Sequence, residues 1–287
     1  MPNPRQDPND VPAIGDWSRL LEGRVAVVTG GGDGIGGAIA SLFAAHGAVL
    51  EIAEIDAGKA ASKVAEVGEA GGAVRSHVVD VTTEEGVAKL AEGVLSRHGR
   101  IDVLVNNVGD FRPLVPFRKS SLDSWNHMYN MNVLHVIAVT RVFIDSMIEQ
   151  RSGAIVNVHS VEGTRGYPSD PVYGAMKAAV AHFTTCLAVQ VGRYGIRVNG
   201  IGPDLTQTEQ VDYITGYEES AHLWESWAPV GRLGWPEDQA RVALFLASDL
   251  SAFVTGHNIP VDGGSKAGGG WFYSPSERRY VSRPRTL

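Results

Sequence analysis

A phenol and an ammonium group lie four residues apart in the segment Tyr173-Gly-Ala-Met-Lys177. Side chains at this spacing share one face of a helix, one turn apart. Lowering the pKa of a tyrosine to near neutrality takes about 4 kcal/mol in favour of the phenolate, and a nearby lysine in a partly desolvated cleft supplies much of it. Tyr173 is therefore predicted to give or take a proton near neutral pH. An unrelated pair on a helix surface is the alternative, because this spacing is frequent by itself.

A hydroxyl group stands close to this pair along the chain. Ser160 ends the β-branched run Gly-Ala-Ile-Val-Asn-Val-His-Ser, thirteen residues before Tyr173. If the run is a parallel strand, Ser160 lies at the carboxyl edge of the sheet, where the active sites of open α/β sheets are found. It is predicted to hydrogen-bond a substrate oxygen and to hold Tyr173 in position, with a turn or helix cap as the alternative. Alternation along the strand points His159 to the opposite face.

A glycine-rich turn follows an early apolar run and leads directly into a segment with helical periodicity. Its spacing is Gly30-x-x-x-Gly34-x-Gly36, which we favour over Gly32-x-Gly34-x-x-Gly37 because the first glycine should stand where the strand ends. Glycines allow positive φ and close backbone approach, so the free N–H groups of the helix N-terminus can meet a pyrophosphate. The turn predicts a dinucleotide site, with a glycine-rich linker as the alternative.

An acidic residue stands where a dinucleotide fold places the adenosine ribose. Glu54 ends the second apolar run, 18 residues beyond Gly36. Its carboxylate would accept hydrogen bonds from the ribose hydroxyls and repel a 2′-phosphate, and Asp33 in the glycine turn adds negative charge. The predicted cofactor is therefore NAD(H) in preference to NADP(H). A surface acid remains the alternative for Glu54, because Glu51 and Asp56 lie close by.

Elements that position these residues alternate between short β-branched runs and longer helical segments. This alternation predicts an α/β fold: a single Rossmann-type doubly wound domain with a seven-stranded parallel sheet flanked by helices on both faces. The expected strands are 24–29, 48–54, 74–79, 101–106, 153–160, 196–201 and 256–261, and the expected helices lie near 34–46, 57–70, 83–98, 121–149, 171–194 and 236–248. The expected divisions are a flexible leader (1–20), a catalytic domain (21–265) with a substrate lid at about 204–230, and a C-terminal tail (266–287).

Composition excludes several classes of protein. A formal net charge of −7 and a sequence pI of about 5.7 argue against a nucleic-acid or anionic-membrane binder. Cys186 is the only cysteine, so neither an intramolecular disulfide nor a cysteine-based zinc site is expected, and the nine histidines show no ligand spacing, so we predict no catalytic metal. The first twenty residues contain no apolar run, and a membrane insertion is not expected. We expect a cytoplasmic protein.

The motifs together match a known pattern in order and spacing. Thr29-Gly30-x-x-x-Gly34-Ile35-Gly36, Asn106-Asn107-Val108-Gly109, Asn132, Ser160 and Tyr173-x-x-x-Lys177 resemble the classical short-chain dehydrogenase/reductase family over roughly residues 20–265. The resemblance implies the catalytic set Asn132, Ser160, Tyr173 and Lys177. In that set Asn132 supports a proton-relay water near Lys177, and Lys177 also binds the nicotinamide ribose. The cofactor-binding residues that the loop and the resemblance predict are Gly30, Asp33, Gly34, Ile35, Gly36, Glu54, Asp80, Val81, Asn107, Val108, Gly109, Tyr173, Lys177, Pro203, Thr206 and Thr208.

The chain departs from the family pattern at two places. Val108 stands where the family usually has alanine, and Pro203-Asp204 stands where it usually has Pro-Gly, so the turn that binds the nicotinamide carboxamide is expected to be altered. Thr206 and Thr208 are either cofactor ligands or ordinary loop residues. Glu162 is either a residue that borders the substrate or a solvated loop charge.

The predicted activity is the NAD(H)-dependent interconversion of a secondary alcohol and a ketone, with a lipophilic small-molecule substrate such as a ring compound. One alternative is a 3-oxoacyl-thioester reductase, for which an acidic carrier protein would need a basic docking patch. Another is a non-catalytic protein that senses NAD(H), against which the complete catalytic set argues. The apolar faces of segments 121–149 and 171–194 predict a homotetramer. The aromatic tail from Trp271 to Tyr280 is expected to pack near the lid or against a neighbouring subunit.

Overall fold

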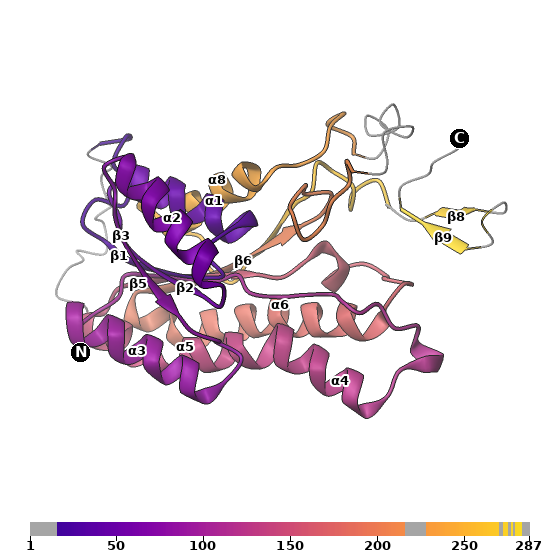
Figure 1. Cartoon of the computed structure of the whole chain (residues 1–287), viewed down its shortest axis with the longest axis horizontal. Coiled ribbons are helices and arrows are strands. Elements are labelled where there is room, and N and C mark those ends of the chain that lie inside the picture. The colour runs from indigo at the N-terminus through magenta and orange to yellow at the C-terminus, as the bar shows by residue number, and fades with distance from the viewer. Residues whose placement is uncertain (1–15, 216–227, 270–271, 275–276, 278, 283–287) are drawn as a thin grey trace.

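Seven parallel strands form the central sheet of the computed structural model, which describes residues 16–215, 228–269, 272–274, 277 and 279–282 (Figure 1). Their order across the sheet is β3-β2-β1-β4-β5-β6-β7. The predicted strands are confirmed, and the chain reverses its direction of travel across the sheet between β1 and β4, which is where ligands bind in doubly wound folds. The strands are β1 (Val25–Thr29), β2 (Val49–Glu54), β3 (Ala73–Val78), β4 (Val103–Asn106), β5 (Gly153–Val158), β6 (Ile196–Pro203) and β7 (Asn258–Val261).

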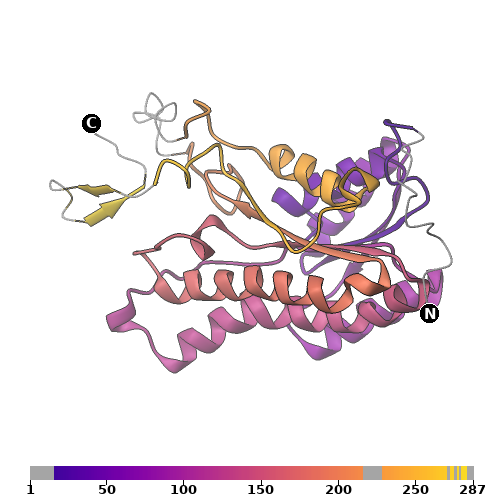
Figure 2. The same cartoon turned by 180° about the vertical axis from the view of Figure 1, so that it is seen from behind.

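Helices cover both faces of the sheet (Figures 1 and 2). One face carries α1 (Gly34–Ala45), α2 (Ala57–Glu69) and α8 (Pro236–Ala247), and the other carries α3 (Glu84–His98), α4 (Leu122–Tyr129), α5 (His135–Gln150) and α6 (Pro171–Val191). Each layer has its own buried core, because a parallel sheet in this fold is apolar on both sides. Phe43 anchors the first core, and Phe143 and Leu187 anchor the second. The predicted Rossmann-type architecture is confirmed.

The predicted helix 121–149 contains an irregular turn. A π-helical segment, Asn130–Leu134, joins α4 to α5 without a break. Such a segment inserts a residue into the α-helical repeat, and it is common at functional sites. Here it turns Asn132 inward, where the side chain is fully buried.

Side chains cap the helices that point at the functional edge. The Asp33 carboxylate accepts the Gly34 N–H at the start of α1. Asp170 accepts the N–H groups of Val172 and Tyr173 at the start of α6, where Pro171 occupies the first helical position. These caps fix the first turns of the two helices that supply the glycine loop and Tyr173.

Two helical stretches are long and apolar enough to cross a membrane by length and composition. They are Leu122–Gln150 and Pro171–Tyr194, with mean hydropathies of 1.5 and 1.2. Both pack against the sheet and contribute Phe143 and Leu187 to its core, so their composition follows from burial within the fold.

Beyond the sheet, part of the predicted lid and of the tail is described. Residues 204–215 and 228–230 belong to the lid, and the aromatic residues Tyr217, Trp224 and Trp227 lie outside the described residues. In the tail, β8 (Phe272–Ser274) pairs antiparallel with β9 (Arg279–Val281) in a hairpin that sequence analysis did not predict. This hairpin stands off from the body, beyond the carboxyl end of the sheet (Figures 1 and 2). Of the predicted leader, residues 1–15 lie outside the described part, and Leu21 directly after it is fully buried.

Candidate active site

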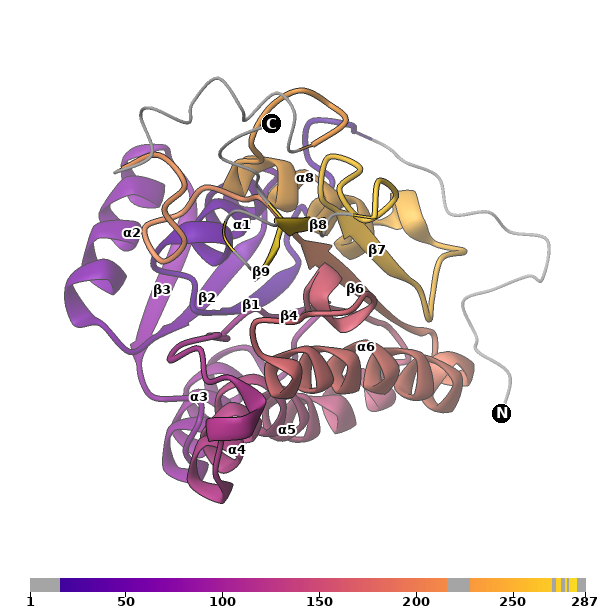
Figure 3. The ribbon, with the colours of Figure 1, turned by 90° about the vertical axis from the view of Figure 1, so that its right-hand side faces the viewer.

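The predicted site residues gather at the carboxyl edge of the sheet. Figure 3 looks onto this edge, with β1 and β4 near the middle, α1 and α2 on one side and α4 and α6 on the other. The glycine turn follows β1, Asn107 follows β4, Ser160 follows β5 and Pro203 ends β6. Because parallel strands bring their carboxyl ends to one edge, segments far apart in the sequence meet here.

The glycine turn has the geometry that a dinucleotide requires. Gly30 and Gly34 have φ values of +62° and +56°, a region that favours glycine. A Cβ on Gly36 would lie 2.0 Å from the Gly30 carbonyl oxygen, so no other residue fits there without moving the backbone. The first turn of α1 leaves the N–H groups of Ile35 and Gly36 without intrahelical partners, which suits a pyrophosphate.

Glu54 lies at the end of β2 beside this turn and is held by backbone donors. Its two carboxylate oxygens accept N–H groups from Gly32 at 3.1 Å, Ile55 at 2.9 Å and Asp56 at 3.1 Å. A carboxylate fixed in this way keeps lone pairs available for ribose hydroxyls. The residues present therefore fit an adenosine ribose.

A second set of charges surrounds the same place. The Lys59 ammonium contacts the carboxylates of Glu209 at 2.6 Å and Asp33 at 3.0 Å, so it joins the described part of the lid to the glycine turn. These two hydrogen bonds, Glu209 first, hold the pKa of Lys59 above its ordinary value. Sequence analysis missed Lys59 and Glu209, because no motif links positions 150 residues apart.

The remaining predicted cofactor residues include two that contact the glycine turn from the segment after β4 and two from the segment after β6. Asn107 donates its side-chain amide to the Thr29 carbonyl at 3.0 Å, and Val108 would contact a Cβ on Gly30 at 3.2 Å. Thr208 lies next to Gly34, whereas the buried Thr206 hydroxyl donates to the Asp204 carbonyl and accepts from Gln239.

Asp80 and Val81 lie just after β3. The Asp80 carboxylate accepts both the N–H and the hydroxyl of Thr82, at 2.9 and 2.7 Å. Val81 belongs to the core under α3 and is 5% exposed. The carboxylate thus orders the loop between β3 and α3 from within, and the role of Asp80 and Val81 in cofactor binding stays a prediction.

The structure brings the four predicted catalytic residues together. The Ser160 side chain acts on the pKa of the Tyr173 phenol, which it lowers, and the Lys177 ammonium lies 5.8 Å from the centre of the Tyr173 ring. A Cβ on Gly109 would lie 2.7 Å from the Lys177 ammonium and 3.0 Å from Asn132 Oδ1. The Lys177 and Asn132 side chains therefore lie on either side of the position that a Cβ on residue 109 would occupy, and only glycine leaves this position open.

Asn132 also fixes the loop that follows β4. Its side-chain amide donates to the Asp110 carbonyl at 2.8 Å and to the Met128 carbonyl at 3.1 Å, and its oxygen accepts the Asp110 N–H at 3.2 Å. Asp110 is thus held at both of its backbone polar groups. Its carboxylate in turn favours the charged form of Lys177.

Burial sets the protonation states at this site. It raises the pKa of Tyr173, and the Ser160 hydrogen bond only partly opposes this effect. Burial likewise lowers the pKa of Lys177 to about 8, against the attraction of Asp110. The cofactor-free site therefore holds a neutral phenol at neutral pH, and proton transfer through Tyr173 needs additional positive charge beside it.

Aromatic rings surround the phenol and were not anticipated. Phe111 meets the Tyr173 ring edge-on at 6.2 Å between centroids, and Tyr167 does so at 5.7 Å. They come from the loops after β4 and β5, where no sequence pattern distinguishes them from other loop residues. A separate apolar cavity of about 180 Å³ lies between α4 and the start of α6, lined in part by Trp125, Met128 and Val172, and contains none of the four catalytic residues.

Contacts around Ser160 show the surroundings of Glu162 and His159, for which sequence analysis made predictions. Glu162 is not a solvated loop charge, since it is 8% exposed and paired with Arg165. His159 points away from the Ser160 hydroxyl, as alternation predicts, and packs its ring against Gly200 and Gly202 of β6. At the turn after Pro203, the Asp204 carboxylate contacts the Arg165 guanidinium at 2.9 Å, and the expected change in carboxamide binding stays a prediction.

Comparisons with known proteins agree with this geometry. A family model described as enoyl-(acyl carrier protein) reductase matches residues 30–266. The chain is 39% identical over 244 residues to the 3-oxoacyl-[acyl-carrier-protein] reductase FabG of Thermotoga maritima, covering 85% of this chain and 98% of that protein.

Solved structures give the same result. A short-chain type dehydrogenase/reductase from Mycobacterium ulcerans has a TM-score of 0.81 at 32% identity, covering 86% of this chain and 91% of that one. A 7α-hydroxysteroid dehydrogenase complexed with NADH and 7-oxo-glycochenodeoxycholic acid has a TM-score of 0.81 at 31% identity, with 88% and 98% covered. The chain belongs to the short-chain dehydrogenase/reductase family.

Membership and site geometry together define the chemistry. The protein is an oxidoreductase that acts on CH–OH groups and uses a nicotinamide cofactor, so the hypothesis of a non-catalytic sensor is set aside. When bound, the nicotinamide exchanges a hydride with the substrate carbon. The glycine turn and the first turn of α1 are the groups that would hold the cofactor's pyrophosphate.

Proposed function

We propose that the protein interconverts a secondary alcohol and a ketone, with Tyr173 as the group that moves the hydroxyl proton. The observation that carries this proposal is the Lys177 ammonium 5.8 Å from the centre of the Tyr173 ring, at the sheet edge where the buried Ser160 follows β5. Ser160 orients the substrate oxygen toward the phenol, Tyr173 takes the proton in oxidation and returns it in reduction, and Lys177 stabilises the phenolate.

Turnover of the Tyr173→Phe variant tests this role. We expect activity to fall to background, because the ring and its packing remain while the transferable proton is lost. Cofactor affinity should stay within about twofold of the wild-type value, since the phenol contributes little to dinucleotide binding. Tyr194→Phe on the far side of α6 serves as a matched control. Retained turnover in Tyr173→Phe would refute the assignment.

We further propose NAD(H) as the cofactor. Glu54, Asp33 and Glu209 place three carboxylates around the end of β2 and the glycine turn, where an added 2′-phosphate would be repelled. Lys59 lies among them, but two carboxylates already engage its ammonium. The related 7α-hydroxysteroid dehydrogenase was solved with NADH.

Fluorescence titrations with NADH and NADPH measure this preference. NADH should bind at least about tenfold more tightly, which corresponds to about 1.4 kcal/mol. Glu54→Gln should reduce the preference, and Glu69→Gln, which removes the same charge from the exposed far end of α2, should leave it unchanged. Equal affinities for the two cofactors in the wild-type protein would count against the proposal.

A lipophilic substrate is supported by the rings of Phe111 and Tyr167 beside Tyr173. A 3-oxoacyl thioester is the second candidate, favoured by the 39% identity to a 3-oxoacyl-[acyl-carrier-protein] reductase. A panel of ring alcohols, aliphatic alcohols and acyl thioesters, followed through the absorbance of the reduced nicotinamide, separates the two.

We expect the protein to be a cytoplasmic homotetramer. The exposed apolar residues of the α4 region, which include Phe117, Leu122 and Trp125, are expected to lie between its subunits.

A further inference from the structure

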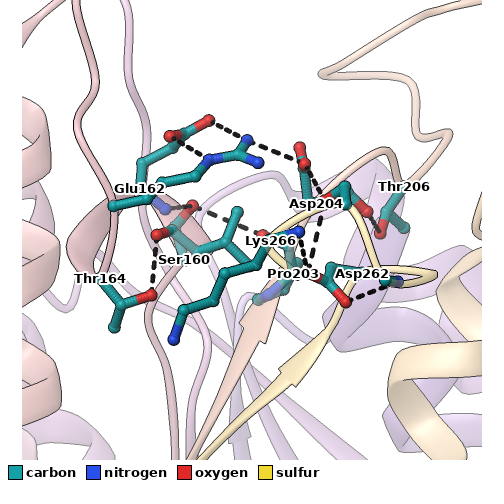
Figure 4. A network of polar contacts seen from close by, with 12 residues as sticks. Ser160, Glu162, Thr164, Pro203, Asp204, Thr206, Asp262 and Lys266 are labelled. Atoms are coloured by element: carbon teal, nitrogen blue, oxygen red, sulfur yellow. Dashed lines mark hydrogen bonds and ion pairs between the residues drawn. The ribbon is translucent and has the colours of Figure 1, made fainter. Parts of the chain in front are cut away.

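A buried ion-pair network lies directly beside Ser160 (Figure 4). The Arg165 guanidinium donates to both oxygens of Glu162, at 3.0 and 2.8 Å, and to Asp204 at 2.9 Å. The three side chains are only 9%, 9% and 6% exposed. Two carboxylates therefore share one cation in a place that water hardly reaches, so each charge depends on the others.

The network joins three loops of the functional edge. Glu162 and Arg165 follow β5, and Asp204 follows β6. The Asp204 carboxylate also accepts the Ser265 hydroxyl at 2.6 Å, and Ser265 belongs to the loop after β7. Asp262 orders that last loop by accepting the N–H of Lys266 at 2.8 Å. Arg165 thus ties the loop after β5 to the loop after β6, and Asp204 extends the network to the loop after β7.

Ser160 lies between the members of this network. Its hydroxyl oxygen accepts the Glu162 N–H at 3.2 Å, and its hydroxyl donates toward the Pro203 carbonyl at 3.5 Å. Both partners are within the loops that Arg165 holds, because Pro203 directly precedes Asp204. Asp204 occupies the position where the family pattern has glycine, so the tie to β6 is a property of this chain.

The network also contributes charge near the phenol. Burial is the main cause of the raised pKa of Tyr173, and Glu162 raises it further. The other charged or titratable groups that act on this site are the Lys177 ammonium on the same helix as Tyr173, the Asp110 carboxylate near Lys177, and the phenols Tyr167 and Tyr213 from the segments after β5 and β6. Arg165 is the cation that offsets Glu162 and Asp204.

We propose that Arg165 is a positioning residue for the Ser160–Tyr173 pair: it fixes the loops on both sides of Ser160 and balances the carboxylates of Glu162 and Asp204. This inference rests on the proposed role of Tyr173 as the proton-transfer group. It predicts that charge changes within the network alter the ionisation of Tyr173 with a sign that depends on which partner is removed.

The test measures the ionisation of Tyr173 in matched variants. The protein is labelled with ¹³Cζ-tyrosine, saturated with whichever oxidised cofactor binds more tightly, and titrated by NMR, with the Tyr173 signal assigned from its absence in Tyr173→Phe. Arg165→Met removes the positive charge that contacts both carboxylates and should raise the midpoint by about one pH unit, a tenfold change in the dissociation constant. Glu162→Gln and Asp204→Asn each remove a negative charge and should lower it.

Arg165→Lys separates charge from geometry. Lysine keeps the positive charge but cannot form the two-pronged contact with Glu162, so the midpoint should stay near the wild-type value while kcat falls about tenfold. If Arg165→Met does not fold, the triple variant Glu162→Gln, Arg165→Met, Asp204→Asn removes the three charges of these ion pairs together. It should titrate below wild type, because the net negative charge of the network is gone.

Two results would overturn the inference. One is a Tyr173 midpoint that is the same in every variant, and the other is a shift in the same direction for Arg165→Met and Glu162→Gln. Either result would mean that the network is purely structural. Turnover of Tyr173→Phe distinguishes this from a failure of the proposed function: retained activity there removes the role of Tyr173 itself, whereas an inactive Tyr173→Phe with insensitive midpoints removes only the role of Arg165.

Discussion

Replacing Lys177 by methionine is expected to stabilise the fold while it removes activity. Lys177 is 4% exposed, and its ammonium is 3.5 Å from the Val158 carbonyl oxygen. Burial holds its pKa at about 8, below the ordinary value of 10.5. This decrease corresponds to a penalty of about 3 kcal/mol for carrying the charge in the folded state, at about 1.4 kcal/mol for each pH unit.

The sign of the effect follows from proton binding. Between pH 8 and 10.5 the unfolded chain binds more protons at this lysine than the folded chain, so the stability of the wild-type protein rises with pH across that window. Methionine has a similar length and no charge to desolvate, and it loses one weak hydrogen bond worth about 1 kcal/mol. At neutral pH the Lys177→Met variant should be more stable by about 2 kcal/mol, and the difference should fall through zero and reverse by about 1 kcal/mol above pH 10.5, where only the lost hydrogen bond remains.

The same substitution should remove phenolate stabilisation. At 5.8 Å and an effective dielectric constant of about 20, the attraction between the ammonium and the Tyr173 phenolate is about 3 kcal/mol. Turnover at neutral pH should therefore fall by at least about 100-fold.

Urea unfolding of the cofactor-free protein at neutral and alkaline pH, together with turnover, measures both effects. The exposed Lys89→Met should change stability by less than about 0.5 kcal/mol. A Lys177→Met variant that is less stable than wild type at neutral pH would refute the reasoning.

Two further substitutions test the cofactor loop and the core. Gly36→Ala places a Cβ 2.0 Å from the Gly30 carbonyl oxygen, so NADH affinity should fall at least about tenfold with secondary structure unchanged, whereas Gly68→Ala, with open space around it, should have no effect. Glu51→Gln should destabilise the protein at neutral pH, because the buried carboxylate contacts His77 at 2.6 Å and His98 at 2.7 Å. Burial by itself would raise the pKa of Glu51, but the two histidines hold this pKa below its ordinary value of 4.5. The ionised Glu51 carboxylate therefore stabilises the folded protein above pH 4.5, and this stabilisation is lost as the pH falls through the lower pKa that Glu51 has in the folded protein. In urea unfolding over an acid pH series, the free energy of unfolding should fall less steeply with decreasing pH in Glu51→Gln than in the wild-type protein. The same steepness in both proteins would contradict the stabilising role of the Glu51 carboxylate.

Sequence analysis predicted those parts of the molecule that are determined by local pattern. The β-branched runs became seven strands, Gly30 and Gly34 took the positive φ values that glycine permits, and Gly36 lies where a Cβ would clash with the Gly30 carbonyl oxygen. Tyr173 and Lys177 share a helix face by spacing alone, and Ser160 stands at a strand end. These features need only the chain within a few residues of the motif.

Contacts between loops could not be predicted in the same way. Arg165 and Asp204 are 39 residues apart, and their ion pair depends on how the turns after β5 and β6 approach each other. The π-helical turn at Asn130–Leu134 could not be predicted either, because the apolar pattern continues through it. Its effect, the burial of the Asn132 side chain, is evident only in the folded structure. Tertiary packing, not local propensity, decides such features.

The order of strands across the sheet has a consequence for how such proteins diversify. Every predicted residue of the adenosine half, from Gly30 to Val81, comes from one continuous stretch, and all four catalytic residues come from β4 onward. The two stretches meet in the sheet at a single strand pair, β1 with β4, in the register Ala26↔Val103, and α1 packs against α8. A recombination between Val81 and Asp102 would therefore exchange the dinucleotide half as a block, provided that the contacts between the halves were matched. These contacts include the packing of α1 against α8, the Arg24–Asp249 and Lys59–Glu209 ion pairs and the hydrogen bond from the Asn107 side chain to the Thr29 carbonyl. Cofactor preference and substrate preference can thus be inherited separately, from different parents.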